Sequence, residues 1–297
     1  MRIVTYETAD GPRPGAVTET DGIVDLGPVA TSVQALIEGG PQALDRARAL
    51  AGTADPVVAL ADARLLAPLP RPVQMRDCLA FEEHLKNAFA QAKTIGGREL
   101  TIPPVWYDQP LYYKANRMSV IGPGAVIEWP RYAQVLDYEL ELACVIGTTG
   151  RDIPADRALD HVFGYTIFND VSARDAQMKE MAGQLGPAKG KDFDTGNVLG
   201  PWIVTSDAIG DPQDLKMEVR VNGERRGGGT SAAMHHGFAQ LIAHISASET
   251  LYAGEVIGSG TVGTGCGLEI GRYLEDGDTI ELEIERIGIL RNQIRKL

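Results

Sequence analysis

The sequence predicts an α+β protein that is mostly β, with a small α/β N-terminal domain before a larger strand-rich domain. Short apolar runs separated by turn residues recur along most of the 297 residues. Only three segments show helical spacing of their apolar residues. The proline-rich stretch LLAPLPRPVQ, residues 65–74, resembles a connection between domains. We therefore expect one domain at residues 1–70 and a second at residues 71–297.

The first domain is predicted from two different patterns. Residues 1–27 are typical of short strands, because Asp10-Gly11 and Asp21-Gly22 are turn signals between apolar runs. Residues 32–52 indicate one or two helices, with a break at Gly39-Gly40-Pro41.

The second domain contains most of the predicted strands and two helices. Asn222-Gly223 indicates a tight hairpin. The order of elements is mixed, so we expect no doubly wound sheet. The predicted strands are 124–130, 135–147, 163–172, 201–206, 215–224 and 278–290, and the predicted helices are 81–97 and 231–251.

Charge and composition restrict the possible partners and the compartment. The net charge of −12 argues against nucleic acid and against an anionic membrane surface. No apolar run approaches the roughly 18 residues of a membrane span, and the N-terminus lacks the apolar core of a signal peptide. Three cysteines without CxxC pairing fit a reducing cytoplasm, so we expect a cytoplasmic protein. A small anionic substrate remains possible, because a metal or local lysines can reverse the field inside a pocket.

An unusual acidic pattern occurs in the predicted strand at 135–147. Asp137, Glu139 and Glu141 occupy alternate positions and so share one face. One interpretation is a solvated face, which we also expect for the three glutamates of TIELEIE at 279–285. The other is a site for a hard cation, since Mg²⁺, Mn²⁺ or Ca²⁺ needs several oxygen ligands.

Two further segments contain polar residues that are candidates for a functional site. In FNDVSARDAQ, residues 168–177, a buried strand runs directly into Asn169-Asp170. Asp77 precedes His84 by seven residues at the entry to a predicted helix. The simpler interpretations are an aspartate that caps a turn and a surface histidine at a helix start.

These segments together resemble the fumarylacetoacetate hydrolase family. LDYELELACVIG is similar to the acidic metal strand of that family, and FNDVSARDAQ to its Asn-Asp-x-Ser-Ala-Arg-Asp segment. GKDFDTGNVLGPW, GSGTVG and YLEDGDTIELEIERIGILRN resemble later motifs in the same order. The resemblance covers roughly residues 71–297. It implies a fumarylacetoacetase-like catalytic domain, a mixed β-roll or sandwich.

The resemblance implies a divalent metal site. Its ligands would be Asp77, Glu139, Glu141 and Asp170, which suit Mg²⁺ or Mn²⁺, with Ca²⁺ as a further possibility. Asp137 matches no ligand and would face solvent or support the site from behind.

The resemblance also implies catalytic residues. His84 would activate water, Glu269 would support the imidazolium, and Lys191 would place positive charge at a developing oxyanion. Glu269 equally fits a residue at a strand edge, and Lys191 has the alternative of a surface lysine. Short family members carry glutamate three residues after the histidine, where this chain has Asn87.

Residues for substrate binding follow from the same motifs. Tyr113, Arg174, Gln177 and Thr261 would contact substrate, although Arg174 is as well explained by an ion pair with a nearby acid. Residues 90–108 form an extended loop that would make a lid or pack against a partner subunit.

The predicted function is metal-dependent hydrolysis of a carbon–carbon bond in a diketo acid or acylpyruvate. Fumarylacetoacetate itself is not expected, because Leu79 and Met181 replace two tyrosines of fumarylacetoacetase. The alternative is a 2-oxo acid decarboxylase, dehydratase or tautomerase that uses the same site. A non-catalytic protein that binds a metal or ligand is a third possibility. The family resemblance also implies a homodimer.

Overall fold

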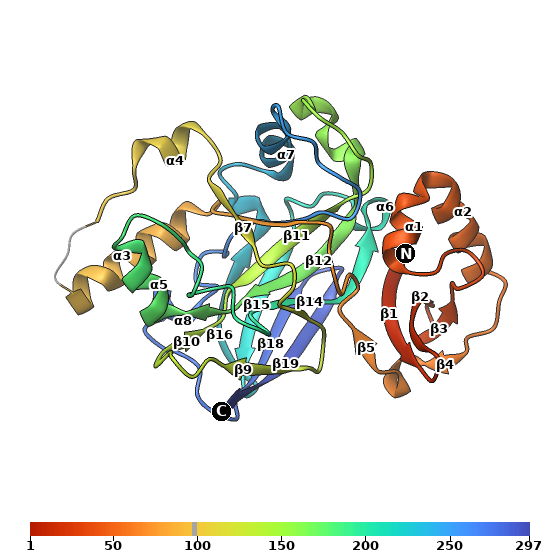
Figure 1. Ribbon diagram of the computed structural model, residues 1–297, viewed down its shortest axis with the longest axis horizontal. Helices are drawn as coiled ribbons and strands as arrows, with labels where there is room; N and C mark the ends of the chain where they lie inside the picture. The colour runs from red at the N-terminus through yellow and green to blue at the C-terminus, as the bar shows by residue number, and fades with distance from the viewer. Residues whose placement is uncertain (97–99) are drawn as a thin grey trace.

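The computed structural model describes residues 1–96 and 100–297 and contains a long sheet, a smaller sheet packed against it, and helices around both (Figure 1). Residues 97–99, part of the extended loop expected at 90–108, lie outside the described residues. The N-terminal strands and helices lie at one end of the molecule, and the remaining elements form its larger part (Figure 1).

The long sheet has 12 strands and joins both predicted domains. Its order is β4-β3-β2-β1-β14-β12-β11-β17-β6-β7, with β5 paired to β1 and β8 paired to β14. Its strands are β1 Arg2–Thr8, β2 Gly11–Val17, β3 Gly22–Asp25, β4 Val58–Ala59, β5 Leu65–Leu66, β6 Met75–Cys78, β7 Tyr112–Ala115, β8 Val120–Ile121, β11 Leu140–Ile146, β12 Val162–Asp170, β14 Asn197–Thr205 and β17 Val256–Gly258. The division at residue 70 stays a prediction, because the pairing of β1 with β14 continues the sheet across it.

The second sheet has five strands in the order β16-β15-β18-β19-β9, and a two-stranded pair, β10 with β13, stands apart. These strands are β9 Val126–Trp129, β10 Leu136–Asp137, β13 Ser172–Ala173, β15 Lys216–Val221, β16 Glu224–Thr230, β18 Thr279–Ile284 and β19 Gly288–Lys296. The helices are α1 Val33–Glu38, α2 Gly40–Ala51, α3 Glu82–Gly96, α4 Pro104–Asp108, α5 Arg174–Met181, α6 Ser206–Ile209, α7 Phe238–Ser246 and α8 Gly267–Ile270, with 3₁₀ turns η1 Leu60–Asp62, η2 Ala155–His161 and η3 Ser231–Ala233.

Strand β11 lies between two hydrophobic cores, which explains its almost continuous apolar sequence. Leu142 and Cys144 belong to the core shared with the five-stranded sheet, where they join residues such as Leu282. The alternate residues Ala143 and Val145 belong to a second core under α1. Every residue of β11 is buried, so this strand is a rigid support for the side chains at its ends.

The predicted strands and helices are mostly confirmed, with three corrections. The strand at 135–147 is interrupted at Tyr138-Glu139, and the strand at 278–290 is a hairpin whose turn places Arg286 at φ 64°. The helix expected at 231–251 begins only at Phe238, because Met234 forms a β-bridge with Phe81 instead. The break between α1 and α2, the hairpin at 222–223 and the absence of a doubly wound order within the described residues agree with expectation.

Among the described residues, we find no helix with both the length and the apolar composition that crossing a membrane requires.

The contact between β12 and β14 generates a test of packing. A Cβ atom at Gly164 would lie 2.3 Å from the carbonyl oxygen of Val204, so the strands would have to separate. We expect Gly164→Ala to lower the free energy of unfolding by about 1–3 kcal/mol, measured by urea denaturation.

Gly52→Ala is the matched control. The residue ends α2 at φ −82°, and its added Cβ would meet nothing nearer than 3.5 Å. Its unfolding free energy should stay unchanged or rise by up to about 1 kcal/mol. Equal effects of the two substitutions would show that the close approach at Gly164 is unimportant.

Candidate active site

Strand register places the four predicted acidic ligands on one face of the long sheet. Asp77 on β6 is paired with Gly258 on β17, and Gly258 is paired with Ala143 on β11. Glu141 precedes Ala143 by two residues, so the two side chains share one face of the strand. Glu139 lies at the interruption before β11, where it forms a β-bridge with Cys266. Asp170 ends β12 and donates its backbone N–H to the carbonyl of Glu139. One carboxylate oxygen from each of the four acids lies within 4.8 Å of the others.

For the four carboxylates to meet, the sheet must be curved, and a side chain must be absent between the strands that carry them. Strands β6 and β12 are three strand spacings apart, about 14 Å in a flat sheet. Gly258 lies between the acids, where a Cβ atom would be 2.6 Å from Glu141 Oε2 and 2.8 Å from Asp77 Oδ1. Because glycine has no side chain, carboxylates from strands on either side of β17 can approach each other.

Two buried cations compensate part of the negative charge. Lys191 Nζ lies 2.7 Å from Glu139 Oε2 and 2.5 Å from Asp170 Oδ2. Arg174 Nη2 lies 2.8 Å from Asp137 Oδ2 and 2.7 Å from Glu139 Oε1. All these side chains are nearly inaccessible to solvent. Asp137 is therefore a buried support of the site, and the alternative of a solvent-facing residue is wrong.

The pKa of one acid of the site is lowered by the two cations, whereas the pKa values of the other three predicted ligands are raised. Burial alone would raise the pKa of Glu139, but Lys191 and Arg174 outweigh it and hold that pKa below its ordinary value. Burial, reinforced by neighbouring carboxylates, raises the pKa of Asp77 and of Glu141 well above the ordinary range. The pKa of Asp170 is also raised by burial, although Lys191 opposes the shift.

The four acids fit a divalent cation. Asp77 Oδ1, Glu141 Oε1 and Asp170 Oδ1 are buried oxygens without a hydrogen-bond partner among the described residues. Unpaired buried carboxylate oxygens are costly in a protein interior. A hard cation such as Mg²⁺ or Mn²⁺ takes this type of oxygen ligand and would neutralise their repulsion.

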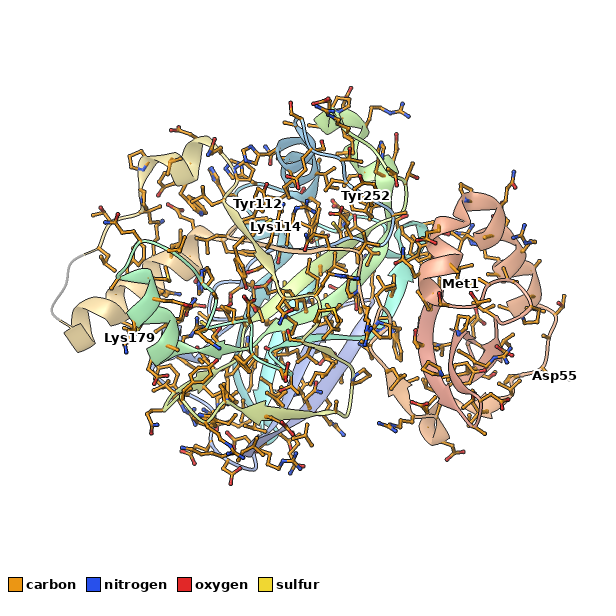
Figure 2. The ribbon with its side chains drawn as sticks, in the orientation of Figure 1. Met1, Asp55, Tyr112, Lys114, Lys179 and Tyr252 are labelled. Atoms are coloured by element: carbon orange, nitrogen blue, oxygen red, sulfur yellow. The ribbon has the colours of Figure 1, made fainter. Side chains whose placement is uncertain are left out.

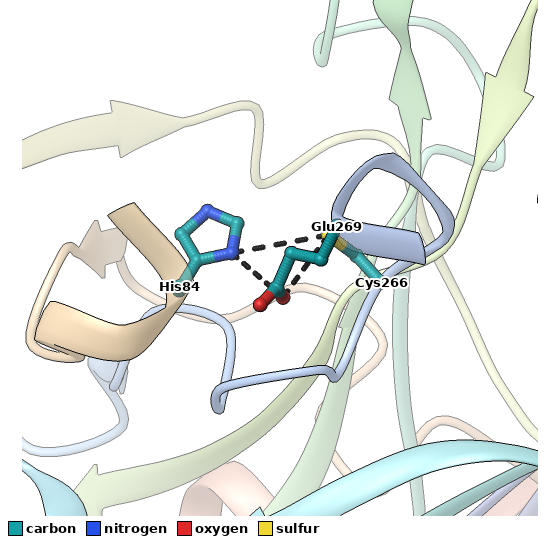
Figure 3. Close-up of side chains that lie close together, drawn as sticks. All are labelled: His84, Cys266 and Glu269. Carbon is teal, nitrogen blue, oxygen red and sulfur yellow. Dashed lines mark hydrogen bonds and ion pairs between the residues drawn. The ribbon is translucent and has the colours of Figure 1, made fainter. Parts of the chain in front are cut away.

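His84 and Glu269 meet beside the acids although 185 residues separate them in the chain. His84 on α3 places Nδ1 2.9 Å from Glu269 Oε1 on α8 (Figure 3). The other oxygen of Glu269 accepts from the backbone N–H of Thr264 at 2.7 Å and from Asn87 Nδ2 at 2.9 Å. Burial opposes ionisation, but the contact with His84, together with the Asn87 and Thr264 donors, outweighs it and lowers the pKa of Glu269.

The turn between Asp77 and His84 is held by a separate aromatic contact. Trp106 on α4 is buried and donates its indole N–H to the carbonyl of Leu79 at 2.6 Å. Its ring stacks on His235 at a centroid distance of 4.8 Å. Residues 90–96 are the end of α3 and residues 104–108 are α4, so the expectation of an extended loop is wrong for these positions. The role of the segment as a lid or a subunit contact stays a prediction.

The predicted substrate-binding residues surround the acids in different ways. The Tyr113 hydroxyl donates to Asp170 Oδ2 at 2.6 Å, and Gln177 accepts from Arg174 Nη1 at 3.0 Å. Thr261 is buried in the loop after β17. The ion pairs of Arg174 favour its structural alternative, although the partners are Asp137 and Glu139 and not the neighbouring Asp175.

The neighbours of Tyr113 on β7 belong to the opposite face of that strand. Tyr112 and Lys114, both labelled in Figure 2, contact the carboxylate of Glu249 at 3.5 and 3.1 Å. Within β7, Tyr113 is the residue that contacts the acidic cluster, by which we mean Asp77, Glu139, Glu141 and Asp170.

Sequence reasoning missed three contributors to the site: Gly258, Cys266 and the partnership of Asp137 with Arg174. Gly258 was part of a recognised motif, but its function as a gap depends on pairing across three strands. Cys266 Sγ lies 3.4 Å from Glu269 Oε1 and 3.8 Å from His84 Nδ1 (Figure 3). The sequence pattern around Asp137 is its alternation with Glu139. Because solvated strands show the same alternation, this pattern could not predict that Asp137 is buried against Arg174.

Comparison with known proteins confirms the family resemblance of the sequence. The family model described as fumarylacetoacetate hydrolase, C-terminal, matches residues 75–295. Oxaloacetate tautomerase YisK of Bacillus subtilis is 38% identical over 237 residues, which are 79% of this chain and 74% of the relative.

Two solved structures match over essentially their whole length. Fumarylacetoacetate hydrolase of Exiguobacterium antarcticum is 33% identical with a TM-score of 0.77, covering 100% of both chains. Maleylpyruvate hydrolase of Sphingobium sp. SYK-6, in complex with manganese(II) ion and pyruvate, is 25% identical with a TM-score of 0.77, covering 100% of this chain and 99% of the other.

The raised pKa values of Asp77 and Glu141 generate a prediction about pH. In the metal-free protein these groups hold protons that the unfolded chain releases above about pH 4. Stability without metal should therefore fall as pH rises through this window, and a cation that displaces the protons should stabilise more at high pH. We expect Mn²⁺ to raise the Tm more at about pH 8 than at about pH 5.5, measured by differential scanning fluorimetry.

Glu141→Gln should abolish most of the Mn²⁺ shift and leave the metal-free protein more stable than wild type at about pH 8. Asp175→Asn is the control, because that carboxylate caps the backbone N–H of Gln134 outside the cluster. A Mn²⁺ shift of the same size at both pH values in wild type would contradict the assignment.

Proposed function

The chain belongs to the fumarylacetoacetate hydrolase family, and we propose that it is a divalent-metal-dependent hydrolase. It cleaves a carbon–carbon bond in a small diketo acid or acylpyruvate. The observation that supports this proposal is the contact between His84 and Glu269, 2.9 Å apart, beside four converging carboxylates. Hydrolysis needs a base for water, and a histidine held by a buried carboxylate is suited to that role.

The chain's own residues account for the proton transfers. Glu269 accepts from His84 Nδ1, which leaves Nε2 as the ring nitrogen that takes a proton from water. The hydroxide adds to the acyl carbonyl, the carbon–carbon bond breaks, and its electron pair passes to the enolate of the leaving 2-oxo acid. His84 then returns the proton to carbon, so an acylpyruvate and water give a carboxylic acid and pyruvate.

Asp77, Glu139, Glu141 and Asp170 would hold the metal ion. When bound, the ion supplies positive charge that stabilises negative oxygens of the substrate. Lys191 keeps Glu139 and Asp170 in place and adds positive charge at the same position. Arg174 orients the other oxygen of Glu139. Tyr113, Gln177 and Thr261 would contact the substrate.

Tautomerisation of a 2-oxo acid is the second candidate, and the name of the Bacillus relative specifically favours it. The same base would take a proton from the carbon beside the keto group and return it at the other end of the enolate. The two reactions differ in whether water attacks, so they are distinguished by their products.

A substrate screen tests both candidates. Purified protein with Mg²⁺ or Mn²⁺ is incubated with acylpyruvates, diketo acids and oxaloacetate. Hydrolysis predicts release of pyruvate from acylpyruvates, followed with lactate dehydrogenase. Tautomerisation predicts faster loss of the enol absorbance of oxaloacetate without cleavage. Failure to accelerate any of these reactions, with metal bound, would contradict both candidates.

A substitution in the pair His84 and Glu269, which we call the dyad, separates catalysis from metal binding. We expect Glu269→Gln to lower kcat about 10²–10⁴-fold, because the imidazolium loses its charged partner. The shift of Tm by Mn²⁺ should stay as in wild type, since Glu269 is outside the group of four acids that would hold this ion.

Asn87→Ala is the matched control, because it removes one donor to Glu269 and keeps the contact with His84. Its loss of kcat should be much smaller. Glu269→Gln with nearly normal kcat would show that His84 acts without this partner.

A further inference from the structure

Three side chains of different chemistry converge at the dyad. His84 Nδ1, Cys266 Sγ and Glu269 Oε1 are all buried, and each lies within 4 Å of the other two (Figure 3). An imidazole, a thiol and a carboxylate in one group are a donor set that suits zinc better than magnesium. The acidic cluster, by contrast, offers oxygen alone.

The distances match a tetrahedral ion. With Zn–S of about 2.3 Å and Zn–N and Zn–O of about 2.0 Å, tetrahedral ligands lie about 3.3–3.6 Å apart. The observed separations are 2.9 Å for N to O, 3.8 Å for S to N and 3.4 Å for S to O. A side-chain adjustment of a few tenths of an ångström would satisfy all three.

The local structure supports the same conclusion. Cys266 caps the start of α8 and Glu269 lies three residues later, so both reach the same side of that turn. Helix α3, packed on α8, contributes His84. Glu269 Oε2 is held by Thr264 and Asn87, which leaves Oε1 directed at the other two donors. Such outer hydrogen bonds are typical of carboxylates that bind metals.

We propose that His84, Cys266 and Glu269 form a second metal site, which binds Zn²⁺ or a similar borderline-soft dication and inhibits the enzyme. Binding would convert the Cys266 thiol to a thiolate and release its proton. Inhibition follows because the ion separates His84 Nδ1 from Glu269. This last step rests on the proposed function of His84, whereas metal binding itself does not.

The local charge balance permits a dication here. Arg174 and Lys191, the buried cations of the neighbouring acidic cluster, are already paired with Asp137, Glu139 and Asp170. Among the described residues, Glu269 contacts His84, Asn87 and Thr264 and pairs with no lysine or arginine. The site therefore offers negative charge that the neighbouring cations leave uncompensated.

Cobalt(II) provides a readout that is independent of turnover. The acidic cluster is first saturated with Mg²⁺ in the full-length protein, and Co²⁺ is then titrated. Coordination by Cys266 should produce a thiolate-to-cobalt charge-transfer band in the near ultraviolet at one equivalent. An oxygen-only site cannot produce this band, so Co²⁺ that enters the acidic cluster does not imitate the result.

Cys266→Ala and Cys266→Ser should both lack the band, and the serine variant preserves volume if the alanine variant unfolds. Cys144→Ala is the matched control, because Cys144 is also a buried free thiol but belongs to the hydrophobic core. It should retain the band. A wild-type protein without the band, or a band that survives in a folded Cys266 variant, would overturn the proposal.

Inhibition of turnover by Zn²⁺ tests whether the proposed site is inhibitory. Each variant is compared with its own rate in Mg²⁺, and we expect Cys266→Ser to need at least about tenfold more free Zn²⁺ for half-inhibition than wild type. If no tested substrate is turned over but the cobalt band appears, the metal site stands and the proposed function fails. Equal inhibition of wild type and Cys266→Ser would refute the assigned inhibitory site.

Discussion

Repulsion among buried carboxylates is the constraint on which this site depends. Asp77, Asp137, Glu139, Glu141 and Asp170 are each at most 5% exposed, and among the described residues the cations paired with them are Lys191 and Arg174. In a medium of low dielectric constant, such an excess of negative charge is unfavourable without a further cation. Lys191 and Arg174 lower the pKa of Glu139, whereas burial and the neighbouring carboxylates raise the pKa of Asp77 and of Glu141.

The strand segment that carries two acids of the cluster also positions Glu269, the partner of His84. Asp137 accepts from the backbone N–H groups of Gly267 and Leu268 at 2.7 and 2.8 Å, so its carboxylate anchors the start of α8. Glu139 forms a β-bridge with Cys266. The position of Glu269 therefore depends on the same residues that hold the acidic cluster. A change in this segment would alter metal binding and the dyad together, because one backbone supports both.

The site is suited to any reaction that passes through an enolate, which explains why similar proteins carry the names of hydrolases and tautomerases. A positive centre stabilises the enolate in both reactions, and a histidine base moves the proton in both. The choice depends on whether water reaches the carbonyl carbon. In the proposed mechanisms, both reactions use the acids and the dyad.

The sequence by itself determined the strand alternation, the four acids, and His84 with its candidate partner Glu269. The strand alternation follows from local periodicity, which short-range sterics impose on the chain, whereas the four acids and the pair of His84 with Glu269 follow from the family resemblance of the motifs. Tertiary structure alone decided the gap at Gly258, the burial of Asp137 against Arg174, and the approach of Cys266 to His84. Each depends on register across several strands or on contact between residues far apart in the chain, and identical local patterns occur on solvated strands.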